Sequence, residues 1–451
     1  MTTGKYFGTD GIRGPANQEP LTPDFAVRLG RAAAVVLGKE GGGRLRVVIG
    51  RDTRISGQML EAALAAGLAS AGADVDLLGV IPTPAVAANA VRLEADFAVV
   101  ISASHNPAGD NGIKFFAGDG FKLPDVTEAA IESVMERPAG AGGFVAGDQV
   151  GVVRTADDAR EAYLRFGLDS VPSLDLKGLT IVVDAAHGAA SGITAEALTR
   201  LGATVVEVGN RPDGMNINNG VGCTHPSFIE AQVREHGADI GIAHDGDADR
   251  TLLVDETGAA LDGDEFLAIA GRHLASEGRL AGNTLVTTVM SNFGLDTSLR
   301  EVGARVERTG VGDRYVIEAM REGGYMFGGE QSGHIIFREF TTTGDGLIAA
   351  LQMLEILRKS GQKLSLLRKC LKKFPQAQKA VPVSSQPPLS EVSEIQRAID
   401  KVEVELGATG RVLVRYSGTE PKLRILLEGP DEARLKELCE QLELVVRAAI
   451  G

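Results

Sequence analysis

The sequence contains no tryptophan, and aromatic residues make up only 4% of its 451 residues. Alanine, valine, leucine and isoleucine must therefore supply most of the hydrophobic core. Hydrophobic residues still account for 44% of the chain and charged residues for 24%, close to the usual globular composition. At about 150 residues per domain, this length predicts about three domains.

Cysteine is scarce as well. Cys223, Cys370 and Cys439 are far apart and outside any metal-ligand spacing, which predicts a protein of the reduced cytoplasm. The stretch MTTGKYFGTDGIRG lacks the apolar core of a signal peptide. A run of about 18 apolar residues, the length needed to span a bilayer, is missing too. We therefore expect no association with a membrane.

Positive charge is in deficit, because 46 Lys and Arg face 60 Asp and Glu and the formal net charge is −14. Nucleic-acid backbones are bound mainly by Lys and Arg that neutralise phosphates, so we expect no nucleic-acid partner. A small phosphorylated ligand remains compatible, because a local basic pocket can lie on an acidic surface. Glycine, by contrast, is abundant with 57 residues, which indicates many tight turns and places where backbone approaches a ligand.

Short β-branched runs alternate with helical patterns along most of the chain. The order begins with a strand at 46–50 and a helix at 56–71, and it starts again at 179–188 and at 283–292. Such alternation is typical of parallel sheets built from βαβ units. It predicts three similar doubly wound α/β domains, although no clear repeat is visible residue by residue.

The C-terminal part follows a different order. The lysines between 359 and 379 indicate a solvated helix face, and a small α+β domain follows, with helices at 391–406 and 431–450 around strands at 410–416 and 422–428. The predicted domains are 1–155, 156–257, 258–370 and 371–451.

The densest carboxylate cluster directly follows a predicted strand. In AHDGDADR, Asp245, Asp247 and Asp249 occupy alternate positions, and ligands of open α/β sheets usually bind beyond the carboxyl ends of strands. Three carboxylates this close raise one another's pKa, and a hard divalent cation removes the conflict. This pattern predicts one Mg²⁺ per chain; a solvated acidic turn is the simpler alternative.

A calcium-binding EF-hand loop is a second alternative for this cluster. Asp245, Asp247, Asp249 and Glu256 fall at positions 1, 3, 5 and 12 of such a loop. Position 6, where the sharp turn requires glycine, is however Arg250, and the flanking segments are predicted strands. The EF-hand is therefore disfavoured.

A second polar loop, SASHNP, follows the predicted strand at 96–101. Together with GDNGIK it places Ser104, His105 and Lys114 near one another. A turn does not require all of these side chains, which favours a functional role. A Ser- or Asx-capped turn with a purely structural role is the alternative. The G-x-S-x-G elbow of α/β-hydrolases does not surround Ser104, so a hydrolase of that type is not supported.

Two further loops carry polar side chains. FGTDGIRG at 7–14 combines three glycines, whose backbone amides can face an anion, with Arg13. GGEQSGHIIF at 328–337 places Glu330, Ser332 and His334 at alternate positions of a predicted extended stretch. There they would share one face and could bind sugar hydroxyls; a polar hairpin is the alternative.

The last loop, RYSGTE, lies between two predicted strands and is rich in phosphate-binding groups. Ser417, Thr419 and the loop amides, including that of Gly418, can cradle a phosphate, with Arg415 and Arg424 as charged clamps. The G-x-x-x-x-G-K-[ST] pattern of an ATP-binding loop is missing. A hairpin with two surface arginines is the alternative.

Taken together, GTDGIRG, SASHNP, DGDADR, GEQSGH and RYSGTEP resemble, in this order, the signature loops of the α-D-phosphohexomutases. The resemblance spans residues 7 to about 429. It implies three similar α/β domains and a smaller C-terminal domain around a central cleft. SHNPxxDNGIKFF, Gln331 in GEQSGH and TTGDGL at 342–347 are most similar to bacterial members that interconvert glucosamine 6-phosphate and glucosamine 1-phosphate in amino-sugar metabolism.

The resemblance also implies an isomerase mechanism. Ser104 would be a phosphoserine that donates its phosphoryl group to a sugar hydroxyl and takes another back, through a sugar 1,6-bisphosphate that turns around in the cleft. Lys114 and His105 would be the candidates for general acid and base. Arg13 and Arg250 would stabilise the charge on the phosphoryl group.

The remaining residues would bind the ligands. The phosphoserine and the three aspartates would hold the Mg²⁺. The sugar hydroxyls would be bound by Glu330, Ser332 and His334. The stationary phosphate would be bound by Arg415, Ser417, Gly418, Thr419 and Arg424. Two spacers depart from the commoner family pattern, with Ala248 in place of Gly and Tyr416 in place of Pro.

Other functions remain open at this stage. Within the class, the alternative is a phosphomannomutase or phosphoglucomutase. Outside it, the chain could be a non-catalytic protein that binds sugar phosphates or calcium. A serine-dependent phosphatase is disfavoured, because a hydrolase has no use for a second phosphate clamp. A homodimer is possible.

Overall fold

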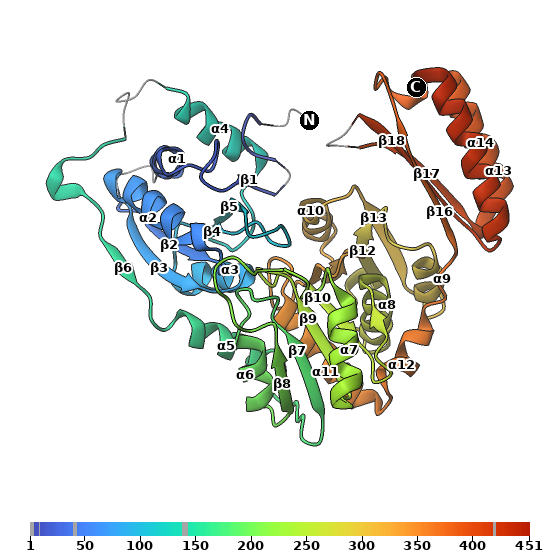
Figure 1. Ribbon diagram of the computed structural model, residues 1–451, viewed down its shortest axis with the longest axis horizontal. Coiled ribbons are helices and arrows are strands. Elements are labelled where there is room, and N and C mark those ends of the chain that lie inside the picture. The colour runs from blue at the N-terminus through green and yellow to red at the C-terminus, as the bar shows by residue number, and fades with distance from the viewer. Residues whose placement is uncertain (1–3, 9, 39–42, 138–142, 418–420) are drawn as a thin grey trace.

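The chain forms four β-sheets, which follow one another along the sequence (Figure 1). A computed structural model describes residues 4–8, 10–38, 43–137, 143–417 and 421–451. The sheets have six, five, four and three strands, and each defines one unit of the molecule. The first unit is blue to teal, the second green, the third yellow to orange, and the fourth red.

The first sheet combines parallel and antiparallel strands. Its core is β2 (Arg46–Arg51), β3 (Asp74–Val80) and β4 (Phe97–Ile101), which are parallel, and β5 (Asp110–Ala117), which runs antiparallel to β4. The order is β5-β4-β2-β3. Two short strands, β1 (Ile12–Pro15) and β6 (Val153–Thr155), extend the two edges.

The second sheet repeats this pattern. Its strands β7 (Thr180–Asp184), β8 (Thr204–Val208) and β9 (Ile240–His244) are parallel, and β10 (Thr251–Val254) runs antiparallel to β9. The order β10-β9-β7-β8 corresponds strand by strand to that of the first sheet. The short β11 (Ala260–Leu261) pairs with β10 at the edge.

The third sheet has the same order again, as β15-β14-β12-β13. Its strands are β12 (Thr284–Thr288), β13 (Arg305–Thr309), β14 (Phe327–Gly329) and the antiparallel β15 (Ile335–Phe337). In all three units, one hairpin loop therefore leads from the third parallel strand into the antiparallel strand. These equivalent loops are SASHNP, DGDADR and EQSGH, so a structural repeat relates loops whose sequences differ.

Helices cover the sheets on both faces, which explains why β4, β9 and β12 are buried along their whole length. The helices of the first unit are α1 (Pro23–Val36), α2 (Ile55–Ser70), α3 (Thr83–Arg92) and α4 (Asp125–Met135). Val47 and Ile49 pack with α1 and α2, whereas Val48 packs with α3 in a core that continues into the second and third units. The helices of the second unit are α5 (Ala159–Asp169), α6 (Ile193–Arg200) and α7 (Pro226–His236). Those of the third are α8 (Gly263–Ser276), α9 (Gly294–Arg300), α10 (Asp313–Gly323), α11 (Gly346–Ser360) and α12 (Leu364–Leu367).

The fourth unit is a separate α+β body. Its antiparallel strands are β16 (Gln376–Pro382), β17 (Arg411–Tyr416) and β18 (Lys422–Glu428), with β18 in the centre, and α13 (Ser393–Leu406) and α14 (Glu432–Ile450) lie against the sheet (Figure 1). Its hydrophobic core contains only residues of this unit. The prediction of three α/β units followed by a smaller α+β unit is confirmed.

One expectation for this region is wrong. The lysine-rich segment does not form one solvated helix face, because it contains the edge strand β16. Only Ala377 and Val381 of that strand are buried, so its composition resembles that of a surface segment.

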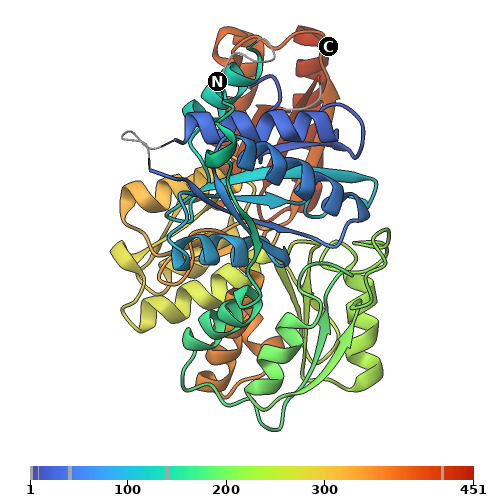
Figure 2. The same cartoon turned by 90° about the vertical axis from the view of Figure 1, so that its left-hand side faces the viewer.

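The units are arranged in an arc. The first unit lies above the second in both views (Figures 1 and 2), and the fourth lies beside the third. No helix within the described residues is long and apolar enough to cross a bilayer. Cys223, Cys370 and Cys439 are all free thiols.

Candidate active site

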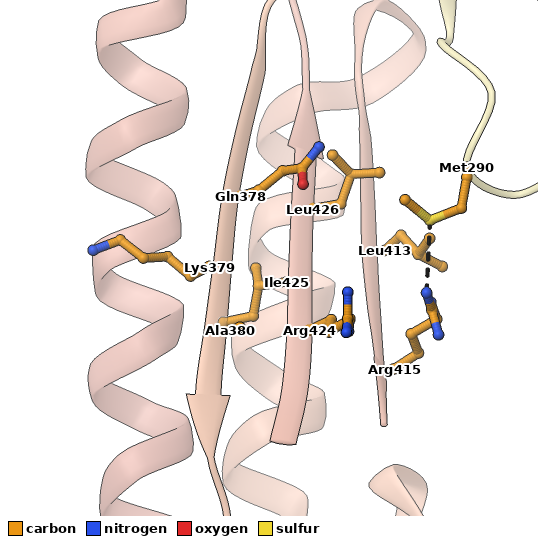
Figure 3. Close-up of a pocket in the computed structure, with 9 residues that line it drawn as sticks. All are labelled: Met290, Gln378, Lys379, Ala380, Leu413, Arg415, Arg424, Ile425 and Leu426. Atoms are coloured by element: carbon orange, nitrogen blue, oxygen red, sulfur yellow. Dashed lines mark hydrogen bonds between the residues drawn. The ribbon is translucent and has the colours of Figure 1, made fainter. Parts of the chain in front are cut away.

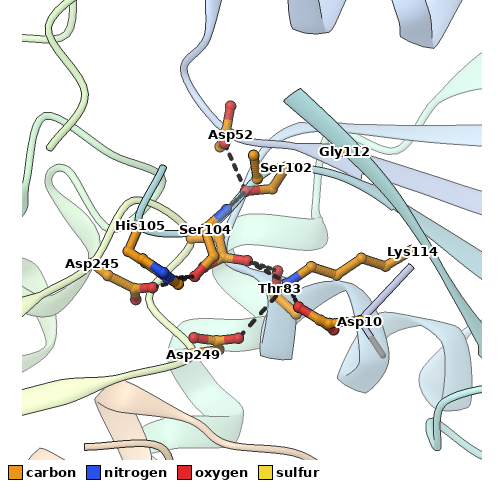
Figure 4. Close-up of polar contacts among 12 residues, drawn as sticks. Asp10, Asp52, Thr83, Ser102, Ser104, His105, Gly112, Lys114, Asp245 and Asp249 are labelled. Carbon is orange, nitrogen blue, oxygen red and sulfur yellow. Dashed lines mark hydrogen bonds and ion pairs between the residues drawn. The ribbon is translucent and has the colours of Figure 1, made fainter. Parts of the chain in front are cut away.

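The hairpin loops of the first and second units meet at Ser104. The Ser104 hydroxyl donates a hydrogen bond of 2.5 Å to Asp245 Oδ2 (Figure 4). Lys114 Nζ lies 3.1 Å from Asp247 Oδ2. Thr83 at the start of α3 also donates to Asp247 Oδ2, at 2.7 Å. The structure thus brings together the predicted nucleophile, the predicted lysine and the aspartate cluster.

The backbone of Ser104 is held in an uncommon conformation. Its φ is +51°, in the left-handed region that non-glycine residues seldom adopt and that usually needs support from its surroundings. The Ser104 amide donates to Ser102 Oγ at 2.9 Å, and Ser102 Oγ in turn donates to Asp52 Oδ2 at 2.6 Å. This chain of hydrogen bonds fixes the amide side of the loop.

Arg54, at the start of α2, fixes the carbonyl side of the same loop. Its side chain is fully buried and forms an ion pair of 2.8 Å with Asp52. Its guanidinium also donates to four carbonyl oxygens, those of Ser104 at 3.0 Å, Asn106 at 2.8 Å, Asp110 at 2.9 Å and Pro107. Sequence reasoning missed this residue, although RDTR, which begins at the last residue of β2, is a polar cluster at a strand end.

The second unit adds a further support. Asn218 Nδ2 donates to the carbonyl oxygens of Ser104 at 2.9 Å and Asn106 at 3.1 Å. Gly246 packs so closely that a Cβ there would lie 2.7 Å from the Ser104 carbonyl oxygen. A side chain at position 246 would therefore push the two loops apart.

Replacing Arg54 with methionine is expected to lower the free energy of unfolding by about 3–5 kcal/mol, because Asp52 would remain as an unpaired buried charge. The matched control is Arg92→Met. Arg92 pairs with Asp158 at the surface, where the two side chains are 35% and 68% exposed, so its loss should cost less than about 1 kcal/mol. Urea unfolding followed by circular dichroism measures both, and equal costs would contradict the clamp role of Arg54.

The aspartate cluster has the composition of a metal site. Asp245, Asp247 and Asp249 are all buried and offer oxygens within 4.8 Å of one another. Asp247 Oδ1 and Asp249 Oδ1 are buried without a hydrogen-bond partner in the described part of the chain. Buried carboxylate oxygens with unused lone pairs fit a hard divalent cation, so these residues could bind a metal.

The pKa values of the cluster reflect this crowding. Burial, followed by the charges of Asp249 and Asp247, raises the pKa of Asp245 well above its usual range. Burial also acts to raise the pKa of Asp249, but His334 and Lys114 outweigh it and hold that pKa below the usual range. The charged form of Asp245 is therefore disfavoured, and a bound cation would stabilise it.

The backbone of this loop is also constrained. Ala248 has a φ of +55°, a conformation that glycine adopts more readily than alanine. His244 connects the loop to α6. Its Nδ1 lies 3.1 Å from the Arg250 carbonyl oxygen and its Nε2 lies 2.9 Å from Thr194 Oγ1.

Cations surround the cluster on the side of the first unit. Lys114 is buried and lies 3.1 Å from Asp10 Oδ2 and 3.8 Å from Asp249 Oδ2, in addition to its contact with Asp247. Burial acts to lower its pKa, but these three carboxylates raise it overall. Arg13 donates to Asp10 and lies 3.5 Å from the carbonyl oxygen of Ala103 in the serine loop. Asp10 therefore holds two of the predicted catalytic cations, and sequence reasoning did not select it.

His105 lies next to the serine hydroxyl, with Nδ1 3.3 Å from Ser104 Oγ. Burial, and then the charges of Arg250 and Arg13, lowers the pKa of His105 to about 4. Its imidazole is therefore neutral at physiological pH.

The equivalent loop of the third unit forms a turn, so the expectation of an extended stretch is wrong. Residues 330–334 connect β14 to β15, and Gly333 has a φ of +90° where a Cβ would lie 2.4 Å from the Thr251 carbonyl oxygen. Ser332 is exposed whereas His334 is buried. The predicted common face of Glu330, Ser332 and His334 does not exist in that form.

The turn nevertheless faces the aspartate loop. His334 Nδ1 lies 3.7 Å from Asp249 Oδ2, and the Gly344 amide donates to His334 Nε2 at 3.0 Å. Burial, together with the charge of Asp313, raises the pKa of Glu330. Arg250 Nε lies 3.9 Å from Asp249 Oδ1. The loops of three units therefore converge on one polar region.

The predicted phosphate clamp forms a separate pocket on the fourth unit. Arg415 and Arg424 are paired directly opposite each other on β17 and β18, and they line a cavity of about 280 Å³ (Figure 3). Met290 of the third unit also lines it, with Sδ 3.8 Å from Arg415 Nη2. Burial and the neighbouring Arg424 lower the pKa of Arg415, so an anion would relieve the repulsion.

The loop beside this pocket is described only in part. Ser417 is buried, and its amide donates to the Lys422 carbonyl oxygen at 2.8 Å. Gly418 and Thr419 lie outside the described residues.

Comparison with protein families divides the chain as the sheets do. Four models of the phosphoglucomutase/phosphomannomutase family match it. The alpha/beta/alpha domains I, II and III match residues 4–140, 161–258 and 262–374, and the C-terminal domain matches residues 378–445.

Individual relatives agree with the family models. The phosphoglucosamine mutase of Syntrophotalea carbinolica is 50% identical over 448 residues, which cover 99% of this chain and 98% of that protein. The phosphoglucosamine mutase of Desulforudis audaxviator is 52% identical and covers 98% of both chains. Among solved structures, a phosphoglucomutase/phosphomannomutase family protein from Burkholderia thailandensis superposes with a TM-score of 0.81 and 26% identity, over 98% of this chain and 97% of that one. The predicted family is thus confirmed, and the chain belongs to the phosphoglucomutase/phosphomannomutase family, the α-D-phosphohexomutases.

Proposed function

We propose that the chain interconverts glucosamine 6-phosphate and glucosamine 1-phosphate, the reaction that supplies UDP-N-acetylglucosamine and peptidoglycan precursors. The observation that carries this proposal is the contact of the Ser104 hydroxyl with the buried aspartate cluster. A serine in that position can store a phosphoryl group. The choice of amino sugar is supported by the relatives, which are named phosphoglucosamine mutases at about 50% identity.

The reaction consists of two phosphoryl transfers through one serine. In the first, a bond from phosphorus to O1 of glucosamine 6-phosphate forms while the bond between phosphorus and Ser104 Oγ breaks; a base takes the O1 hydroxyl proton, and Ser104 Oγ receives a proton. The glucosamine 1,6-bisphosphate then turns around. In the second transfer, the phosphoryl group on O6 moves to Ser104 Oγ, which gives up its proton, and O6 receives a proton, which leaves glucosamine 1-phosphate.

The groups around Ser104 suit these steps. His105, which is neutral, and Lys114, which is an ammonium, are the candidates for proton acceptor and donor. Arg13 and Arg250 would stabilise the charge on the phosphoryl oxygens. Such fixed charges in a buried site cost no reorganisation during the transfer.

Asp245, Asp247, Asp249 and a phosphoryl oxygen on Ser104 would hold one Mg²⁺ per chain. When bound, the ion neutralises charge that develops on the transferring phosphoryl group.

The phosphate that is not transferred needs a second site. The pocket of Arg415 and Arg424 suits it in either orientation of the sugar, with Ser417, Gly418 and Thr419 as further donors. Glu330 and Ser332 would contact the sugar hydroxyls, whereas the third predicted contact, His334, is buried against Asp249. The domain limits proposed for these roles are 1–155, 156–257, 258–370 and 371–451. Cytoplasmic location, a homodimer and the lack of a nucleic-acid partner remain predictions.

A coupled assay with glucosamine, glucose and mannose phosphates tests the proposal. We expect kcat/KM to be highest for the glucosamine phosphates. A preference of tenfold or more for glucose or mannose phosphates would replace this proposal with a phosphoglucomutase or phosphomannomutase. Turnover of none of them would favour a non-catalytic binding protein.

A further inference from the structure

A segment of the first unit, residues 117–128, lies against the third unit. Thr342 Oγ1 donates to the Gly120 carbonyl oxygen at 2.5 Å. Arg314 Nη2 donates to the Leu123 carbonyl oxygen at 2.9 Å and to Glu128 Oε2 at 3.2 Å. The segment therefore connects two units whose loops both reach the candidate active site.

The segment turns back along β5 so that Lys122 points toward that site. The Ala117 amide donates to the Phe121 carbonyl oxygen at 2.7 Å, and Lys122 pairs with Phe116 in an antiparallel bridge. Paired residues in such a bridge project to the same face, and so do residues two apart in one strand. Lys122 therefore projects to the same face as Lys114.

At the end of its side chain, the Lys122 ammonium joins two units. Its Nζ forms ion pairs with Asp10 of the first unit and with Asp313 at the start of α10 in the third, and the lysine side chain is only 11% exposed. Burial acts to lower its pKa, but Asp10 and Asp313 raise it overall. An ammonium has three donors and no acceptor, so one lysine can hold both carboxylates at once.

Both carboxylates continue toward the candidate active site. Asp10 Oδ2 lies 3.1 Å from Lys114 Nζ (Figure 4). Asp313 Oδ2 lies 3.7 Å from Nε2 of His334 in the predicted sugar loop. Opposite charges thus alternate from Asp313 through Lys122 and Asp10 to Lys114, and His334 adjoins the Asp313 end.

We propose that Lys122 is a positioning residue for phosphoryl transfer. It fixes Asp10, and through Asp10 the ammonium of Lys114, when Asp313 of the third unit is seated against it. Within the described residues, the ion pairs of Lys122 are with Asp10 and Asp313, and neither Ser104 nor an aspartate of the cluster is among them. The inference rests on the proposed function, because it assigns Lys114 to the transfer step.

Lys122→Met tests this role, because methionine keeps most of the apolar stem and removes the charge. We expect kcat to fall about 10- to 100-fold, as for loss of a group that orients a catalytic residue, and KM to change less than about threefold. Lys122→Arg keeps a cation for both carboxylates and should recover at least about tenfold of the lost kcat. In the double variant Lys122→Met/Asp313→Asn, the fold-loss of kcat should be smaller than the product of the fold-losses of the two single variants, because the two residues act through one contact.

Arg314→Gln is the matched control. It removes other polar contacts between the same two units but leaves the chain of charges intact, so kcat should stay within about twofold of the wild type. An unchanged kcat in Lys122→Met would overturn the inference, and so would an equal loss in Arg314→Gln, since the contact surface would then be responsible. A wild-type protein that turns over no sugar phosphate would instead overturn the proposed function, and this inference with it.

Discussion

Ser104→Ala is expected to reduce the turnover of glucosamine phosphates by at least ~10⁴-fold, because the alanine methyl group cannot accept a phosphoryl group. The variant should still fold. Ser104 already adopts a left-handed backbone conformation, which costs alanine about as much as serine, and Arg54 and Asn218 bind its carbonyl oxygen rather than its side chain. The loss should therefore appear in kcat and not in the unfolding temperature.

Intact-protein mass spectrometry gives an independent readout of the same residue. After incubation with a sugar 1,6-bisphosphate, the wild type should carry one phosphoryl group and Ser104→Ala none. The control is Ser276→Ala, at the exposed end of α8, where the hydroxyl only binds the carbonyl oxygen of His273; its activity should remain within about twofold of the wild type. Full activity in Ser104→Ala would rule out a serine-based transfer.

Asp245→Asn is expected to lower kcat by about 10³-fold, because loss of one charged ligand weakens the binding of the metal ion. That ion contributes several kcal/mol to transition-state stabilisation. Addition of Mg²⁺ should raise the unfolding temperature of the wild type, since a ligand that binds only the folded state stabilises it. The same addition should have little effect on Asp245→Asn.

In the absence of Mg²⁺, Asp245→Asn should be at least as stable as the wild type. The folded-state pKa of Asp245 is raised, so the stability linked to this group is present below its unfolded pKa of about 3.9 and is lost as the pH rises toward the folded value. At pH 7 the neutral asparagine avoids that cost, and the metal-free variant should unfold at the same temperature as the wild type or higher.

Asp158→Asn serves as the control for nonspecific effects of Mg²⁺, because Asp158 is an exposed carboxylate in a surface ion pair. It should respond to Mg²⁺ as the wild type does. A full Mg²⁺ response in Asp245→Asn would show that the cluster does not hold the ion.

Most of the fold could be predicted from the sequence, because strands covered by helices on both faces are continuous apolar runs. FAVVI in β4 and TIVVD in β7 are of this kind. The strand β16 could not be predicted in the same way. It lies at the edge of its sheet with one face in solvent, and only Ala377 and Val381 mark its buried side.

The candidate site could be predicted in its chemistry but not in its connections. SASHNP and DGDADR stand out because serine, histidine and aspartates follow buried strands. Asn218 and Lys122 do not stand out, since the groups they bind are backbone carbonyl oxygens or carboxylates in distant parts of the chain. Arg54 belongs to a polar cluster at a strand end, but its role depends on carbonyl oxygens 50–56 residues away. Alternating polar residues at 330–334 predict an extended stretch, but the glycines at 329 and 333 permit a turn there instead.

The sequence by itself determined which kinds of groups are present and in what order the strands occur, because both depend on local composition and periodicity. Only the tertiary structure decided which of these groups are neighbours. Ser104 and Asp245 are separated by 141 residues, and their contact depends on how the first and second units pack. The packing of the first unit against the third places Lys122 between Asp10 and Asp313. Such contacts depend on the relative placement of whole sheets, which local patterns do not encode.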